Sequence, residues 1–360
     1  MSGRLWMLSR KHPPSVGGMQ QLSWHLVRGV SAVRPVTAIT WGGGSWGLPL
    51  FFAWAQLRLA LGLAFNRIAV LHLGDPALAA LAWLPRLAGV PVFATVHGLD
   101  ITHRARWYQC YLDRFFWGRM RAYACISRHV QSLVLARGVD AAIAPVIPVG
   151  IDIADFPERA LAGPGQRGLE LLCLGRLVDR KGVAWLLEAV APAWLARHPQ
   201  ARLRIAGDGP ARARIEALAG NAALRGQVQV LGAVDEAAKR DLLANADLLL
   251  MPNLAIAGDA EGFGLVCLEA GASGAWVLAS DIEGLRDAVV VGENGDHLPS
   301  GDAHAWSEAL DLLCADPVAL RARGASARDA VAARFGWNAI IAQYAALTDA
   351  LANGSPAHGR

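Results

Sequence analysis

The sequence predicts an α/β protein made of two doubly wound domains, and three observations support that prediction. Short apolar runs alternate with helical patterns along all 360 residues, which is the rhythm of parallel strands joined by crossover helices. The rhythm occurs twice, on either side of the Pro/Gly-rich stretch D-F-P-E-R-A-L-A-G-P-G-Q. The chain is also too long for one domain of ordinary size and fits two.

The expected strands are short apolar runs in both halves of the chain. They lie at Leu5–Leu8, Ile68–Leu71, Val92–Thr95, Ala122–Ile126, Glu170–Leu174, Arg202–Ile205, Val228–Leu231, Asp247–Met251 and Trp276–Ala279. Helical patterns in the second half lie at Val183–Val190, Ala211–Leu218, Glu236–Leu243 and Ala303–Cys314. We expect a first domain over residues 1–155, a linker over 156–166, a second domain over 167–334, a helix over 335–351 that packs back on the first domain, and a disordered tail over 352–360.

Composition and charge indicate a well-buried protein whose halves have different partners. The chain is 54% hydrophobic and 18% charged, which excludes a disordered protein. Residues 1–160 hold 16 Lys/Arg against 7 Asp/Glu, whereas residues 161–360 hold 18 against 23. The five cysteines lack C-x-x-C spacing and several lie in apolar runs. We therefore expect reduced thiols in a cytoplasmic protein, with neither metal nor disulfides.

No secretory signal and no membrane span are predicted. The apolar stretch at the amino terminus is too short for the h-region of a signal peptide. Trp46–Phe65 is long enough to span a bilayer, but Pro49, Gln56 and Arg58 interrupt it. A central Arg opposes insertion by roughly 2.5–3.5 kcal/mol. We expect a buried or membrane-surface helix there.

Loops that follow the expected strands carry unusual chemistry, and doubly wound sheets bind ligands at the carboxyl ends of their strands. In P-P-S-V-G-G-M-Q, Gly17 and Gly18 open a helix and let backbone N–H groups approach a phosphate. The spacing is not the G-x-G-x-x-G of a dinucleotide site, and a plain tight loop is the alternative. In V-H-G-L-D, His97 ends a strand on the ligand side, where it is either functional or structural.

The second half supplies cations and a further glycine turn. In L-G-R-L-V-D-R-K-G, Arg176 and Lys181 lie at a strand end and a helix start. Two cations there suit a diphosphate, Arg as a planar fork and Lys as a point charge, and a solvated basic loop is the alternative. In A-G-D-G-P, Gly207 and Asp208 form part of a turn that can lie beside a ligand.

Two carboxylates, Glu261 and Glu269, stand eight residues apart in E-G-F-G-L-V-C-L-E. An acidic residue, a glycine turn and a helix start can hydrogen-bond a polyhydroxyl ligand, while N–H groups at the helix N-terminus face a phosphate. Taken alone, the stretch also fits an acidic loop before a core helix, or a hydrolytic carboxylate pair.

In this order, G-R-L-x-x-x-K-G, G-D-G-P and E-G-F-G-x-x-x-x-E resemble the retaining glycosyltransferases of family 4 (glycosyl transferases group 1). The resemblance extends from the early Gly-Gly loop to F-G-W-N-A-I-I-A-Q-Y. It implies the GT-B fold, in which two doubly wound Rossmann-like domains face each other across a cleft. It also implies a hexosyltransferase that moves a hexose from a UDP- or GDP-sugar to a hydroxyl of a cell-envelope glycan or glycolipid, of the lipopolysaccharide type or lipid-linked, without a cofactor.

The resemblance assigns a role to each candidate residue. Arg176 and Lys181 would bind the donor diphosphate and replace a divalent metal, Glu261 would bind the donor sugar, Glu269 the ribose, and His97 would lie beside the reacting carbon. Further donor contacts would come from Gly17, Gly18, Gly207, Asp208, Gly262, Phe263, Gly264 and Leu265. The glutamates would then not be a glycosidase acid/base pair. A long segment between Pro252 and Glu261, and a reduced E-G-L-R-D element, leave the donor sugar open.

The partners of the basic half have competing interpretations. His103–Tyr123 combines five Arg with seven aromatic residues, which fits a half-buried helix with snorkelling Arg side chains, an interfacial helix on anionic lipid, or a single-stranded nucleic-acid site. The acidic second half argues against nucleic acid. We expect a cytoplasmic protein, peripheral on the inner face of the cytoplasmic membrane.

Two other classes of function compete with a transferase. A nucleotide-sugar epimerase or a phosphorylase should need further acids or a cofactor lysine, and neither is evident in the sequence. The other alternative is a silent nucleotide-sugar-binding protein, against which the intact Arg176, Lys181, Glu261 and Glu269 argue.

Overall fold

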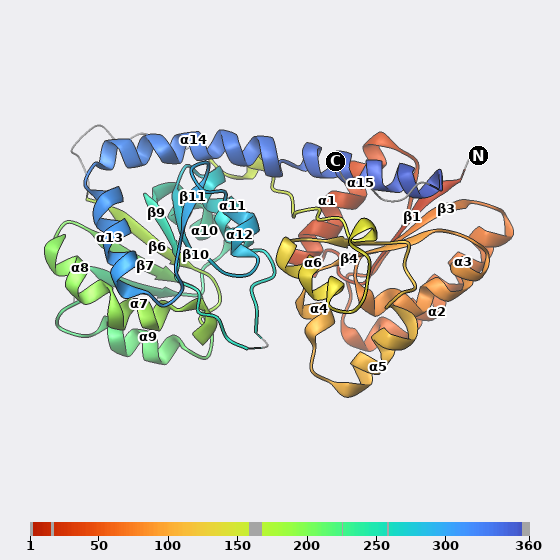
Figure 1. The fold of residues 1–360 in the computed structure, drawn as a ribbon, viewed down its shortest axis with the longest axis horizontal. Coiled ribbons are helices and arrows are strands. Elements are labelled where there is room, and N and C mark those ends of the chain that lie inside the picture. The colour runs from red at the N-terminus through yellow and green to blue at the C-terminus, as the bar shows by residue number, and fades with distance from the viewer. Residues whose placement is uncertain (1–2, 16–17, 158–167, 225, 258, 355–360) are drawn as a thin grey trace. The chain divides into compact units, whose positions relative to one another are not determined.

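Two sheets of parallel strands organise the protein, each in a compact unit of its own. The computed structural model describes residues 3–15, 18–157, 168–224, 226–257 and 259–354. One unit contains Met1–Gly150 and Trp337–Arg360, and the other contains Ile151–Gly336 (Figure 1). The first divide lies at residue 150 rather than at 155. Most of the expected linker and of the expected tail lies outside the described residues.

The first unit is a five-stranded parallel sheet in the order β2-β1-β3-β4-β5. Its strands are β1 (Arg4–Ser9), β2 (Val36–Thr40), β3 (Ile68–Leu73), β4 (Val92–Val96) and β5 (Ala122–Cys125). Its helices are α1 (Gly18–Val33), α2 (Leu48–Ala64), α3 (Trp83–Leu87), α4 (Leu99–Thr102), α5 (Arg106–Phe115), α6 (Arg128–Leu135) and α15 (Trp337–Ala352), with 3-10 turns η1 (Ser45–Gly47), η2 (Pro76–Ala82) and η3 (Ala141–Ile143).

Alternating side chains of β1 pack against helices on both faces of this sheet. Trp6 faces α2, where a Cβ on Gly62 would come within 2.6 Å of the indole, so only glycine permits this approach. Met7 faces the other way and lines a pocket with side chains of α1. The carboxy-terminal helix α15 packs on α1, and the ring of its Tyr344 lies 5.7 Å from that of His72 in β3.

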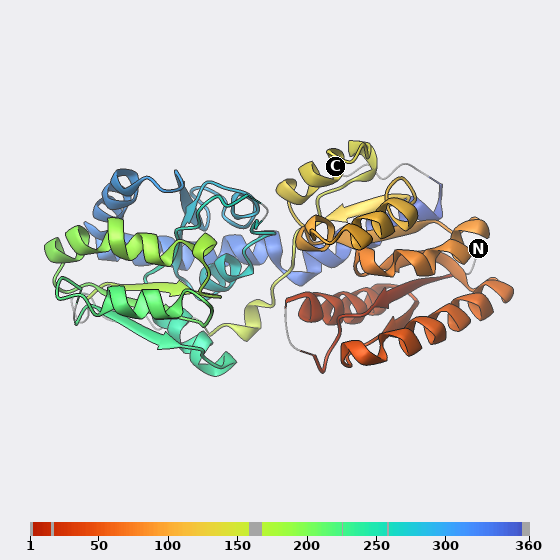
Figure 2. The same ribbon diagram turned by 90° about the horizontal axis from the view of Figure 1, so that it is seen from below.

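The second unit, coloured green to blue in Figure 2, is a six-stranded parallel sheet in the order β11-β10-β9-β6-β7-β8. Its strands are β6 (Glu170–Leu174), β7 (Arg202–Ala206), β8 (Val228–Gly232), β9 (Leu248–Met251), β10 (Trp276–Ser280) and β11 (Gly295–Leu298). Its helices are α7 (Val183–Ala189), α8 (Ala191–Arg197), α9 (Arg212–Ala219), α10 (Glu236–Asn245), α11 (Leu265–Ala272), α12 (Leu285–Ala288), α13 (Ala303–Cys314) and α14 (Pro317–Phe335), with 3-10 turns η4 (Ile153–Asp155) and η5 (Asp179–Lys181).

Strand order reverses once in each sheet, and the reversals position the candidate sites. In the first unit β1 leads to β2 on one side, while β3, β4 and β5 extend to the other. In the second unit β6, β7 and β8 run one way and β9, β10 and β11 run the other. Doubly wound sheets bind ligands where the order reverses, at the carboxyl ends of the strands. Those points are the β1/β3 and β6/β9 boundaries.

Every expected strand is present to within two residues, and the two strands without a prediction, β2 and β11, are sheet edges. The segment G-D-H-L of β11 contains no apolar run, so periodicity could not reveal it. Within His103–Tyr123, the helix covers only Arg106–Phe115, and Ala122 and Tyr123 already belong to β5.

The apolar segment Trp46–Phe65 forms a helix with one buried face. Phe51, Ala55, Leu59 and Gly62 of α2 are buried, whereas Leu50 and Leu57 are exposed. None of the helices in the described part of the chain is both long and apolar enough to cross a membrane.

Candidate active site

The loops that follow β6 and β7 are joined by backbone hydrogen bonds. Leu177 N–H donates to the carbonyl oxygen of Asp208 at 2.9 Å, and Ala211 N–H donates to that of Leu177 at 3.0 Å. Gly207 lies so close that a Cβ there would be 1.8 Å from the carbonyl oxygen of Gly175. Gly207, the first glycine of G-D-G-P, is therefore required because the two backbones approach so closely. The Asp208 carboxylate forms an exposed pair with Arg212, and its contact with a donor stays a prediction.

Lys181 lies at the β6/β9 boundary because of the glycine that follows it. Gly182 has φ +66° and a Cβ there would be 1.8 Å from the carbonyl oxygen of Pro252, directly after β9. Leu254 N–H also donates to the carbonyl oxygen of Arg180 at 2.8 Å. The loop after β6, which carries the cations of the R-K-G sequence, is thus held against the loop after β9.

Glu261 is the centre of an ion-pair cluster at this boundary. Its Oε2 accepts a hydrogen bond from Lys181 Nζ, another from Arg180 Nη1 at 2.7 Å and a longer one from Asn253 Nδ2 at 3.3 Å. Its Oε1 has no hydrogen-bond partner among the described residues. One carboxylate oxygen is therefore anchored, and the other is available to a ligand.

The backbone of Glu261 is fixed by the E-G-L-R-D element that follows β10. Glu261 N–H donates to Oε2 of Glu283, and Gly284 N–H donates back to the carbonyl oxygen of Glu261 at 3.1 Å. Glu283 adopts a left-handed conformation with φ +49°, which is rare for a non-glycine residue. This reduced element thus positions the carboxylate loop.

The cations decide the protonation state of Glu261. Burial by itself raises the pKa of this carboxyl group, but the ion pairs with Lys181 and Arg180 outweigh burial and lower the pKa to about 2. The group is ionised throughout the neutral range. It accepts hydrogen bonds and cannot serve as the protonated acid of a glycosidase pair.

Glu269 lies in the second turn of α11 and is buried. Its Oε1 accepts a hydrogen bond from Lys239 of α10 at 3.0 Å, and Lys239 also pairs with the exposed Glu236 at 2.9 Å. Burial raises the pKa of Glu269, and Lys239 opposes that rise. The two glutamates of E-G-F-G-L-V-C-L-E therefore have pKa values displaced in opposite directions.

The glycine turn between the glutamates starts helix α11. Gly264 has φ +88° and immediately precedes Leu265, the first helical residue. The ring of Phe263 packs edge-on against Phe335 at 6.1 Å, so Phe263 can offer a ligand only its backbone. Gly262 closely approaches Gly284: a Cβ on Gly284 would lie 2.3 Å from the carbonyl oxygen of Gly262.

Arg176 differs from the other cations of the second unit. Its side chain is exposed and forms no ion pair with any described residue. It lines a small hollow together with Gly175, Lys181 and Asn253. Asn253 is buried and its Oδ1 has no hydrogen-bond partner. The hollow therefore presents an unpaired cation and an unsatisfied amide oxygen.

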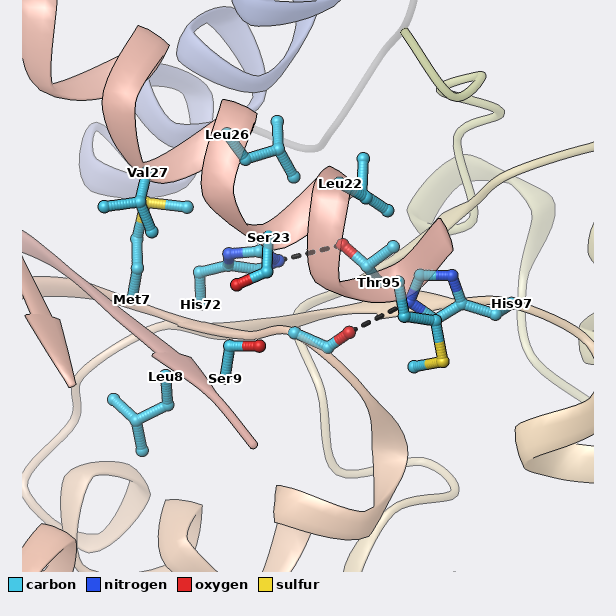
Figure 3. Close-up of a pocket in the computed structure, with 12 residues that line it drawn as sticks. Met7, Leu8, Ser9, Leu22, Ser23, Leu26, Val27, His72, Thr95 and His97 are labelled. Atoms are coloured by element: carbon cyan, nitrogen blue, oxygen red, sulfur yellow. Dashed lines mark hydrogen bonds between the residues drawn. The ribbon is translucent and has the colours of Figure 1, made fainter. Parts of the chain in front are cut away.

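The β1/β3 boundary of the first unit holds a pocket with about 300 Å³ of empty space (Figure 3). His97 donates from Nε2 to the carbonyl oxygen of Gly74 at 3.0 Å, which leaves Nδ1 for another partner. His72 contacts Thr95 at 2.9 Å, and burial lowers its pKa to about 3, so the ring is neutral. Gly18 begins α1 beside this pocket, while Gly17 lies outside the described residues.

Sequence reasoning missed the partners of the predicted residues. Arg180, Asn253, Lys239 and Glu283 all contact a predicted carboxylate or its backbone. Asn253 had a usable signal, since it follows a buried strand within two residues. Within the described ranges, no three His, Cys, Asp or Glu residues gather as metal ligands.

Family models match both units: Glycosyltransferase Family 4 over residues 11–155 and Glycosyl transferases group 1 over residues 162–330. A phosphatidyl-myo-inositol mannosyltransferase from Mycobacterium tuberculosis is 30% identical, in an alignment that covers 93% of this chain and 90% of that protein. The chain belongs to the group 1, family 4 glycosyltransferases. This glycosyltransferase is a hexosyltransferase.

Solved structures agree with the GT-B fold of the family. Sucrose-phosphate synthase from Thermosynechococcus elongatus matches with a TM-score of 0.75 at 21% identity, over 98% of this chain and 100% of that one. HepE from Anabaena in complex with UDP-glucose matches with a TM-score of 0.69 at 19% identity, over 94% and 98%. These likenesses concern the fold.

Proposed function

We propose that this glycosyltransferase moves a hexose, with retention of configuration, from a UDP- or GDP-sugar to a hydroxyl of a lipid-linked or lipopolysaccharide-type envelope acceptor. The proposal includes no metal and no cofactor. The observation that carries it is the cluster at the β6/β9 boundary, where Arg176 has no counter-ion among the described residues and Lys181 lies beside an ionised Glu261. Fixed cations at such a point stabilise the charge that develops on a departing diphosphate.

Each residue of the second unit has a role in the proposed reaction. Arg176 and Lys181 bind the diphosphate, and backbone N–H groups at the start of α11 add contacts. The free Oε1 of Glu261 accepts a hydrogen bond from a sugar hydroxyl, and Glu269 accepts from the ribose. We assign His97 to the donor sugar. A carboxylate with a pKa of about 2 is a weak base, so we assign the acceptor proton to a diphosphate oxygen.

Two relatives support a hexosyl donor and a lipid acceptor. HepE was solved with UDP-glucose, and the mycobacterial relative is named for mannosyl transfer to phosphatidyl-myo-inositol. An enzyme that uses a lipid acceptor must reach a membrane surface, and the first unit carries a surface suited to that.

That surface is a stripe of large apolar side chains along α2 and just beyond its two ends, which we call the α2 stripe. Its members are between 45% and 83% exposed and recur every three or four residues: Trp46, Leu50, Trp54, Leu57, Leu61 and Phe65. The chain has no Asp or Glu before Asp75, and the guanidinium groups of Arg58 and Arg67 lie over the rings of Trp54 and Phe65. An apolar helix face with cations and no carboxylates fits the interface of an anionic bilayer. We propose that the protein is cytoplasmic and peripheral there.

A panel of nucleotide sugars tests the proposed reaction. We expect one UDP- or GDP-hexose to raise the melting temperature by mass action and to be hydrolysed slowly without acceptor, with or without EDTA. Lys181→Ala should strongly reduce both effects, whereas Arg214→Gln, which removes an exposed ion pair with Glu188, should change neither. Absence of binding and turnover with every donor would contradict the proposal, and dependence on a divalent ion would contradict its metal-free form.

A further inference from the structure

Arg180 contacts two carboxylates at once. Its Nε lies 3.0 Å from Oδ1 of Asp259 and its Nη1 lies 2.7 Å from Oε2 of Glu261. The planar guanidinium of Arg suits such a two-sided contact, which a Lys ammonium cannot reproduce. Its backbone is fixed as well, through the hydrogen bond from Leu254 N–H. Arg180 is thus held from both ends of its side chain.

Lys181 is held less firmly. Its only ion-pair partner among the described residues is Oε2 of Glu261, the oxygen that Arg180 also contacts. A donor diphosphate brings negative charge to the hollow that Lys181 lines with Arg176. If Lys181 turns toward that charge, Glu261 loses one of its two cations at the moment when it must receive the sugar.

We propose that Arg180 is the resident partner of Glu261, whereas Lys181 moves from Glu261 to the diphosphate when the donor binds. Arg180 is then a positioning residue, which keeps Oε2 anchored and leaves Oε1 to the sugar hydroxyl. This inference rests on the proposed function. It deepens that function by dividing two neighbouring cations between the sugar side and the phosphate side of the donor.

Asp259 explains why Arg180 does not follow Lys181 to the phosphates. The Asp259 carboxylate forms an ion pair with Nε of Arg180 and so opposes rotation of the guanidinium toward another anion. Asp259 belongs to the long segment between Pro252 and Glu261, where a bridge between Ile256 and Asp259 closes a turn. The extension of this loop thereby supplies the counter-ion that assigns Arg180 to Glu261.

Arg180→Gln separates the two cations experimentally. We expect its affinity for the nucleoside diphosphate alone, UDP or GDP, to fall by less than about tenfold, because no sugar is present to need Glu261 and only the pull of the unpaired carboxylate on Lys181 opposes binding. Its kcat/KM for the nucleotide sugar should fall on the order of 10²-fold, the size of effect that a misplaced group causes. Lys181→Ala should weaken binding of both ligands, and Arg214→Gln is the matched surface control.

Asp259→Asn and a pH profile distinguish positioning from general damage. Asp259→Asn should lower kcat/KM by about tenfold, and the double variant should be no worse than Arg180→Gln, since both changes break one unit. Among the described residues, Arg180, Lys181, Asn253 and Glu283 contact Glu261, the Cys267 thiol interacts with it electrostatically, and Asp259 lies behind Arg180. In the donor complex of Arg180→Gln, where Lys181 lies on the diphosphate, burial and the remaining carboxylates should move the acid limb of kcat upward, to a pH at which it can be measured.

The outcomes are separable. If Arg180→Gln weakens binding of the nucleoside diphosphate as much as it lowers kcat/KM, Arg180 binds phosphate and the inference is wrong. Additive losses in the double variant, or an acid limb that does not move, would also overturn it. If the wild-type protein binds no nucleoside diphosphate at all, the proposed function fails first. Melting temperatures of the variants show whether a loss reflects unfolding.

Discussion

The two sheets share one architecture, but the points where their strand orders reverse carry different chemistry. At the β6/β9 boundary, Arg180 and Lys181 pair with an ionised Glu261, and Arg176 lines a hollow together with Lys181. At the β1/β3 boundary, the pocket is lined by apolar side chains, hydroxyl groups and two histidines. The scaffold fixes where a ligand can bind, and the loops decide which ligand is accepted.

The difference matches the two substrates that we propose. A nucleoside diphosphate needs fixed cations, whereas an acceptor hydroxyl needs neutral donors and acceptors. Beside the pocket of the first unit, Arg10 pairs with the buried Asp75 at 2.9 Å, so these two charges offset each other. Changes in one unit should therefore affect donor binding, and changes in the other should affect transfer or membrane binding.

The largest effect is expected from Lys181→Ala. Loss of one fixed cation at a developing charge lowers kcat by about 10²–10³-fold, and the affinity for UDP or GDP should fall as well. Arg176→Ala should act in the same direction. Steady-state kinetics and calorimetric titration with the nucleoside diphosphate measure both quantities. If the kcat of Lys181→Ala stays within tenfold of the wild-type value, the cations at the β6/β9 boundary do not take part in the reaction as proposed.

His97→Ala tests the other side of the comparison. His97 keeps Nδ1 free while Nε2 donates to Gly74, so we expect kcat to fall by about 10²-fold, at the lower end for a group that acts at the reacting atoms. Binding of the nucleoside diphosphate should remain at the wild-type level. If that binding weakens as much as in Lys181→Ala, the division of roles between the units is wrong.

The third prediction concerns the α2 stripe. Leu57→Gln combined with Leu61→Gln removes two exposed Leu side chains. Full burial of one such side chain in an apolar environment stabilises membrane binding by about 1.5–3 kcal/mol at most. Co-sedimentation with anionic liposomes at low salt should weaken by at least about tenfold, without a change in donor hydrolysis. Leu312→Gln is the matched control, because Leu312 is an exposed leucine of α13 in the other unit.

Two results would contradict this prediction. The variant could bind liposomes as the wild type does, or the wild type could bind neutral and anionic vesicles equally, which would leave the nearby arginines without a role. Concentration-dependent dimerisation that the same substitutions abolish would assign the stripe to a second copy of the chain.

Every strand except the sheet edges β2 and β11 could be predicted from the sequence, but the contacts between side chains could not. Apolar periodicity reports burial, and it located every core strand of both sheets. Polar residues at strand ends then indicated Lys181 and Glu261. The sequence could not show that Arg180, in the same loop, contacts Glu261, because that contact joins residues 81 positions apart. Nor could it show that Lys239, on a different helix, is the partner of Glu269.

The smallest effect on activity is expected from Lys239→Met, and its sign follows from the pKa of Glu269. Burial raises that pKa and Lys239 opposes the rise, so the substitution should raise it further. Affinity for the nucleoside diphosphate should fall a few-fold at neutral pH, and further as the pH drops and Glu269 loses its charge. The unpaired carboxylate should also destabilise the fold by about 1–2 kcal/mol, a value below that for fully buried pairs.

The destabilisation in Lys239→Met should be largest at high pH. A carboxyl group whose folded pKa is raised opposes folding while it is ionised, and protonation relieves that opposition as the pH falls through the raised pKa. Thermal melts of Lys239→Met across pH should therefore converge toward the wild type in acid. Adding Glu269→Gln should restore stability at neutral pH without restoring ribose binding. A double variant as unstable as Lys239→Met would show that Lys239 acts through packing, and Glu269 would then need no cation to remain buried.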